Sequence, residues 1–99
     1  MNITNNEHSL TISDVRELTA GTANETKNKV RLQFPPELKH IDFNCSALDF
    51  LDSSGLGALI SLQKLASERG GRFRLLSPKP TIIQVLEMTR LHRVFEIVA

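Results

Sequence analysis

The chain has 99 residues, of which 40% are hydrophobic, and a formal net charge of +1. These values suit one globular domain, and the nearly neutral charge argues against a dedicated nucleic-acid-binding protein. The single cysteine, Cys45, excludes an internal disulfide and fits a reducing, cytoplasmic compartment. No apolar run approaches the roughly 20 residues of a membrane span, and the polar residues 1–7 carry no signal-peptide pattern. We therefore expect a single cytoplasmic domain over residues 1–99.

The first third of the chain is predicted to form a strand and a helix. Residues 8–13 alternate between apolar and polar side chains, which is typical of a half-buried strand. Thr22 and Glu25 have the spacing of a capping box, which predicts a helix near 22–33. The Pro-Pro pair that follows must end this helix, because proline lacks a backbone N–H and disfavours helical geometry in the residue before it.

The middle of the chain is predicted to contain a strand, a loop and the longest helix. Residues 39–45 carry the strand pattern, and residues 46–51 are expected to form a loop. A helix is predicted over 55–69, with Gly70 as its C-cap. The apolar arc of this helix is wider than the roughly 100° that one packing face needs. Either two neighbouring helices flank it, or part of the arc stays exposed for a partner.

The last third of the chain completes an alternating pattern. Residues 72–76 are predicted to form a strand, and Pro80 suits the first position of a helix over 81–89. A final strand over 94–98 contains Phe95, an expected core residue. Strands and helices thus alternate along the chain, which indicates an α/β fold with helices packed against the sheet.

The most informative segment is the hexapeptide Asp-Ser-Ser-Gly-Leu-Gly, which starts at Asp52 and leads into the longest helix. The first turn of a helix has unpaired N–H groups and a partial positive charge, so it favours a phosphate. We interpret Ser54 as a cap or first-turn residue whose hydroxyl can carry one. Asp52 would accept a nearby N–H or orient that hydroxyl, while Gly55 and Gly57 would let a kinase backbone approach closely. Ser53 is a rival acceptor, and Ser54 as a mere helix cap is the structural alternative.

Other chemistry is disfavoured by the sequence. Asp52 stands where the nucleophile elbow of hydrolases needs a glycine, which argues against a triad of Ser54 with His40 or His92. The three histidines lack metal-ligand spacing, and the Gly-Lys-Ser/Thr ending of a phosphate-binding loop is missing. Cys45 is expected to be a small core residue. We therefore expect no catalytic residue, no metal and no cofactor.

Residues 48–57, Leu-Asp-Phe-Leu-Asp-Ser-Ser-Gly-Leu-Gly, resemble the signature of STAS domains and, more narrowly, of bacterial anti-sigma factor antagonists. Residues 85–95 are similar to the closing helix and strand of that family. The order of elements matches along nearly the whole chain. The resemblance implies a single STAS-like domain, in which helices pack against a small mixed β-sheet.

The resemblance also implies a non-enzymatic partner switch in signal transduction. The second serine of the motif, here Ser54, would be phosphorylated by a kinase-type anti-sigma factor that uses ATP. The unmodified form would capture the anti-sigma factor, the phosphorylated form would release it, and a PP2C-type phosphatase would reset the switch. The expected partner-binding residues are Phe50, Leu51 and Leu56. The alternative is a STAS-fold adaptor subunit of a membrane-associated lipid-transport complex, in which Ser54 is only a helix cap.

Two positions depart from the family pattern. Thr19 stands where relatives carry an acidic residue near the phosphoserine, and Arg90 stands in the place of the glycine of a Thr-Gly-Leu segment. The change at Thr19 favours the adaptor, whereas the complete hexapeptide favours the phosphorylation switch.

Overall fold

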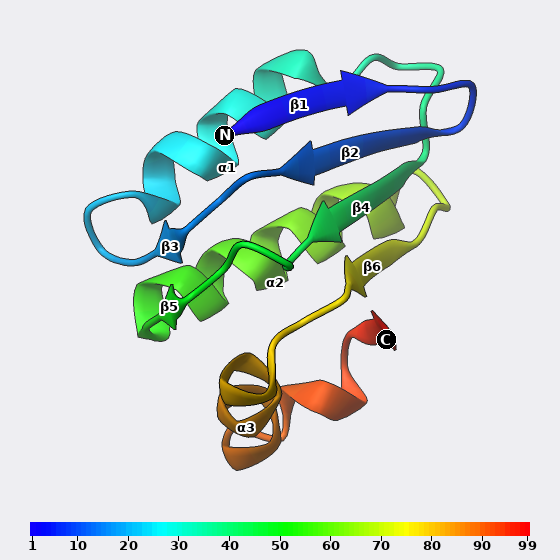
Figure 1. The fold of residues 1–99 in the computed structure, drawn as a ribbon. Helices are drawn as coiled ribbons and strands as arrows, with labels where there is room; N and C mark the ends of the chain where they lie inside the picture. The colour runs from blue at the N-terminus through cyan, green and yellow to red at the C-terminus, as the bar shows by residue number, and fades with distance from the viewer.

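A mixed five-stranded sheet forms the frame of the computed structural model, which describes residues 1–99 (Figure 1). The strand order is β1-β2-β4-β6-β7, with β1 antiparallel to β2 and the other neighbours parallel. The strands are β1 (Asn2–Asn5), β2 (Ser9–Ser13), β4 (His40–Asn44), β6 (Phe73–Leu76) and β7 (Glu96–Val98). The predicted α/β class and the small mixed sheet are confirmed.

Two helices cover one face of this sheet. Helices α1 (Ala23–Gln33) and α2 (Ser53–Glu68) lie on the same side of the strands, and α3 (Pro80–Met88) follows β6 (Figure 1). The opposite face carries polar side chains, among them the buried Asp42, whose carboxylate accepts two hydrogen bonds from Arg74, at 2.8 and 2.9 Å. The sheet therefore has an apolar face under the helices and a polar face outside. None of the helices has the length and apolarity to cross a membrane.

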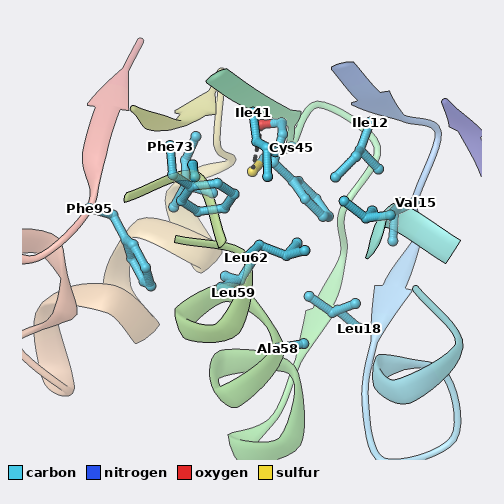
Figure 2. Close-up of a cluster of buried hydrophobic side chains, with 14 of the residues drawn as sticks. Ile12, Val15, Leu18, Ile41, Cys45, Ala58, Leu59, Leu62, Phe73 and Phe95 are labelled. Carbon is cyan, nitrogen blue, oxygen red and sulfur yellow. Dashed lines mark hydrogen bonds between the residues drawn. The ribbon is translucent and has the colours of Figure 1, made fainter. Parts of the chain in front are cut away.

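The hydrophobic core lies between the sheet and α2. Figure 2 shows Ile12, Ile41 and Phe73 of the sheet meeting Leu59 and Leu62 of α2. Burying one such large apolar side chain stabilises the fold by about 1.5–3 kcal/mol. Leu59 and Leu62 are wholly buried, so α2 is the helix that the core fixes most firmly in place.

Two residues named by sequence reasoning as core residues lie in this core. Phe95 is buried and packs edge-on against Phe73, with ring centroids 5.7 Å apart. Cys45 is wholly buried, and that burial raises the pKa of its thiol to about 12. Cys45 is therefore an unreactive core residue, as the sequence predicted.

The segment predicted as a loop over 46–51 contains a short strand. β5 (Phe50–Leu51) pairs in parallel with β3 (Glu17–Leu18), which sequence analysis did not predict. Each strand has only two residues, too few to show an alternating pattern. The pairing matters for the site because it fixes the chain immediately before α2.

The predicted capping box at the start of α1 is wrong. Thr22 occupies the N-cap position, but its Oγ1 accepts a hydrogen bond from the Thr19 N–H at 3.0 Å and donates to the Glu17 carbonyl at 3.1 Å. Glu25 instead pairs with Lys29 at 2.9 Å, one turn along the helix. The Thr22 hydroxyl is therefore engaged by the turn that leads from β3 into α1.

The apolar arc of α2 and the end of the chain also differ from expectation. The arc packs on α1 and on strands β3, β4, β5 and β6, so the sheet covers part of it. The final strand is shorter than the predicted 94–98, because a 3-10 turn, η1 (Leu91–Arg93), follows α3. Arg90 precedes that turn in the left-handed region, with φ +61°, and Val94 remains half exposed.

Candidate functional site

Helix α2 begins two residues earlier than predicted, and Asp52 is its N-cap. Asp52 has an extended backbone, and its Oδ1 accepts a hydrogen bond from the Gly55 N–H at 2.9 Å. The Asp52 carbonyl accepts from the Leu56 N–H, also at 2.9 Å. Aspartate is among the preferred N-cap residues for this reason. Ser54 therefore lies in the first turn of α2 and does not cap it.

The second carboxylate oxygen of Asp52 reaches a different segment. Oδ2 accepts a hydrogen bond from the Ala20 N–H at 3.0 Å, so one side chain ties the turn before α1 to the start of α2. The Gly55 N–H, followed by that of Ala20, lowers the pKa of Asp52. Asp52 is thus an ionised residue whose two oxygens are engaged by backbone N–H groups. It positions the loop, and it is not hydrogen-bonded to the Ser54 hydroxyl.

The Ser54 hydroxyl is exposed and makes no hydrogen bond within the protein. Ser53 is exposed in the same way. Serine hydroxyls at helix starts usually satisfy a backbone N–H, and here Asp52 already does so. The two hydroxyls therefore have no hydrogen-bond partner that a modification would disrupt.

The two glycines of the hexapeptide have different roles. A Cβ on Gly55 would lie 1.9 Å from the Leu18 carbonyl oxygen, so Gly55 lets α2 pack directly on β3. Gly55 is buried, so the expectation that a kinase backbone approaches it is wrong. Gly57 is exposed, and an added Cβ there would have no neighbour within 4 Å. Gly57 therefore leaves the surface beside Ser54 open.

The three expected partner-binding residues divide into one exposed and two half-buried side chains. Phe50 is 66% exposed on β5, immediately before α2. Leu51 and Leu56 are half-buried and pack against the hydrophobic core. Of these three side chains Phe50 therefore exposes the most apolar surface, while Leu51 and Leu56 mainly hold the loop on the core.

Sequence reasoning missed a hollow of about 350 Å³ beside Ser54. It lies between α1 and α2, and its lining includes Ala23, Asn24 and Lys27 of α1 and Ser54, Gly57 and Ser61 of α2. The signal was present in the sequence as small residues spaced three and four apart along α2, because Ser54, Gly57, Ala58 and Ser61 line the hollow. That spacing places side chains on one face of a helix.

The histidines are not brought to the hexapeptide. Nδ1 of His40 accepts a hydrogen bond from the Arg72 N–H at 3.0 Å, and Nδ1 of His92 lies 3.4 Å from the Leu86 carbonyl oxygen. No three His, Cys, Asp or Glu side chains gather closely enough to hold a metal ion. The polar groups around Ser54 are therefore Asp52 and the residues of the hollow.

Comparison with known proteins agrees with this architecture. The STAS domain family model matches residues 1–99. An anti-sigma F factor antagonist from Paenibacillus polymyxa is 29% identical over 96 residues, which cover 92% of this chain and 81% of that protein.

Solved structures show the same fold. A Thermotoga maritima protein, provisionally named an anti-sigma factor antagonist, superposes with a TM-score of 0.91 at 26% identity, covering 99% of this chain and 85% of that one. The unphosphorylated form of the anti-sigma factor antagonist SpoIIAA superposes with a TM-score of 0.81 at 22% identity, covering 99% and 87%. The chain belongs to the STAS domain family, and the relatives it matches are anti-sigma factor antagonists.

Proposed function

We propose that this protein is a non-enzymatic anti-sigma factor antagonist that acts in the cytoplasm by partner switching, with Ser54 as its phosphoacceptor. In its unmodified form it binds a kinase-type anti-sigma factor, and phosphorylation of Ser54 releases that partner. A PP2C-type phosphatase restores the unmodified form. The names of its relatives support the regulatory class.

The single observation that carries the choice of residue is the state of the Ser54 hydroxyl. It is exposed on the first turn of a firmly packed helix, it has no hydrogen-bond partner, and it lines the hollow between α1 and α2. Ser53 shares the exposure but does not line the hollow. Ser54 therefore combines accessibility with a defined surrounding surface, which suits recognition by a kinase.

The chemistry is a phosphoryl transfer and its hydrolytic reversal. Ser54 Oγ forms a bond to the γ-phosphorus of ATP, the bond from that phosphorus to the β,γ-bridging oxygen breaks so that ADP departs, and the hydroxyl proton passes to a base of the kinase or to solvent. In the reverse direction water attacks the phosphoserine, which yields inorganic phosphate and the serine hydroxyl. Both catalytic centres belong to the partner enzymes, and this chain supplies the positioned hydroxyl.

Phosphorylation would release the partner mainly by a local change of charge. A phosphoserine carries about −1.5 to −2 charges at neutral pH. It would stand beside the ionised Asp52 and near the exposed ring of Phe50. A partner surface that fits the neutral hydroxyl and the apolar ring would then meet the phosphate. An apolar surface would have to remove water from that charge, and an acidic surface would be repelled by it. Such juxtapositions cost several kcal/mol, so no rearrangement of the fold is needed.

The test is intact-mass spectrometry after incubation with an anti-sigma factor kinase from the same genome and ATP. We expect one phosphoryl group on the wild type and on Ser53→Ala, and none on Ser54→Ala. An equal mass gain on Ser54→Ala would overturn the assignment. Circular dichroism of the three proteins serves as the folding control.

Nothing in the fold or in the relatives described above favours the lipid-transport adaptor. That alternative assigned Ser54 a capping role, and in the structure Asp52 has it.

A further inference from the structure

The hollow beside Ser54 contains one charged side chain. Most of the residues that line it are small, Asn24 and Lys27 of α1 are larger, and Lys27 is the single ionisable residue among them. Lys27 projects from the second turn of α1 and is half-buried. The side of the hollow opposite Ser54 is therefore positively charged.

Lys27 has no anionic partner in the protein. The five ion pairs of the structure involve other residues, and the neighbouring Lys29 pairs with Glu25 at 2.9 Å. Asn24 lines the same wall one turn before Lys27, and its amide makes no hydrogen bond within the protein. A lysine has three donors that a phosphate group can use, and an asparagine amide has two.

The start of α2 binds a phosphate less favourably than an uncapped helix N-terminus does. The Asp52 carboxylate already accepts the Gly55 N–H, and its negative charge opposes a second anion at the same place. A phosphate on Ser54 would therefore need a cation from outside α2, and Lys27 is the cation that shares its hollow.

We propose that Lys27, assisted by Asn24, binds the phosphate of phosphorylated Ser54 in the hollow between α1 and α2. This inference rests on the proposed function. The ion pair would join the two helices across the hollow. The positive charge of Lys27 would also offset part of the repulsion between the phosphate and the Asp52 carboxylate. Lys27 is then a positioning residue for the modified state, and the partner meets a phosphoserine that is held in one orientation.

The test uses protein with phosphoserine built in at position 54 during translation, so that no kinase is required. Phosphorus NMR titration measures the second pKa of the phosphate, which is ordinarily about 6. We expect this pKa to be lower in the wild type than in Lys27→Gln by about 0.2–0.7 pH units, the range that a partly exposed ion pair supports. Lys27→Arg should retain the lower value.

Lys29→Gln is the matched control. It removes the same charge from the same helix, but Lys29 borders a different hollow and is paired with Glu25. We expect its phosphate pKa to equal that of the wild type. Equal pKa values in the wild type and Lys27→Gln, or equal shifts in both lysine variants, would overturn the role of Lys27. Either result would leave Ser54 as the acceptor, whereas failure of the kinase assay would leave the Lys27 measurement unaffected.

Discussion

Helices α2 and α3 both follow short strand segments, yet their first turns are built differently. The start of α2 is capped by the carboxylate of Asp52, whereas the N-cap of α3, Lys79, makes no side-chain capping bond and Pro80 supplies the first helical residue. Each helix has an exposed hydroxyl two residues after its cap, Ser54 in α2 and Thr81 in α3. The two hydroxyls differ in their surroundings, because Ser54 follows a carboxylate cap and lines the hollow between α1 and α2.

The largest expected effect concerns partner binding. Ser54→Asp should weaken binding to the anti-sigma factor kinase by about 3 kcal/mol, or roughly a hundredfold, because it puts a charge in the contact surface. Thr81→Asp at the matching position of α3 should leave the affinity unchanged. Isothermal titration calorimetry measures both. If Ser54→Asp binds as the wild type does while its melting temperature stays the same, the local-charge explanation of release is wrong.

The second effect separates the two glycines of the α2 start. Gly55→Ala should lower the free energy of unfolding by about 1–3 kcal/mol or more, since the new methyl group would overlap the Leu18 carbonyl oxygen. The methyl group of Gly57→Ala would have no neighbour within 4 Å, and alanine favours a helix more than glycine does. This variant should therefore raise the free energy of unfolding by about 0.5–1 kcal/mol. Urea unfolding of both variants gives the values. Similar destabilisation by both would show that the Leu18 contact is not the cause.

The third effect concerns the caps. Asp52→Ala should lower the melting temperature by about 4–8 °C, because it removes a typical N-cap from a domain of this size. Lys79→Ala removes no capping bond, only a partly exposed ion pair with Asp49, and should lower the melting temperature much less. Differential scanning calorimetry measures the difference. A drop for Lys79→Ala as large as that for Asp52→Ala would contradict the contrast between the two helix starts.

The stabilisation from Asp52 should depend on pH. Its pKa is lowered in the folded state by the N–H groups of Gly55 and Ala20, so the carboxylate stabilises the fold above its unfolded pKa of about 3.9. This contribution is lost as the pH falls through the lower, folded pKa. The melting-temperature gap between the wild type and Asp52→Asn should therefore be constant near neutral pH and narrow below about pH 4. A gap that widens in acid would contradict the assignment.

The smallest expected effect extends the comparison to the helix ends. Gly70 follows α2 with φ +75°, whereas Arg90 follows α3 with φ +61°. A residue with a side chain pays roughly 1–2 kcal/mol to adopt this left-handed backbone conformation. Replacing it by glycine removes that cost, but glycine loses more conformational freedom on folding, which offsets part of the gain. Arg90→Gly should therefore stabilise the domain by about 0.5–1 kcal/mol in urea unfolding. Gly70→Ala should destabilise it, and stabilisation by both would refute the argument.

The sequence predicted the elements that have strong periodicity or a core role. The strand near residues 8–13, helix α2, the burial of Cys45 and the fold class follow from pattern and composition, because each depends on many apolar residues acting together. The hexapeptide was placed correctly at the start of α2.

The features that sequence reasoning missed depend on contacts between distant segments. The β3–β5 pair is formed by two residues on each side, and the bond from Ala20 to Asp52 joins residues 32 positions apart. Thr22 matched a capping box locally, but its hydroxyl is engaged by the preceding turn. The hollow between α1 and α2 likewise exists only once the two helices are packed together.

The burial of Cys45 has a practical consequence for studying the switch. Because the native thiol is wholly buried with a pKa of about 12, it will not compete for maleimide reagents at neutral pH. A single cysteine introduced at exposed Met88 can then carry a fluorophore without removal of the native one. The wild-type sequence is in effect a ready background for single-site labelling, in which capture and release of a partner can be followed in real time.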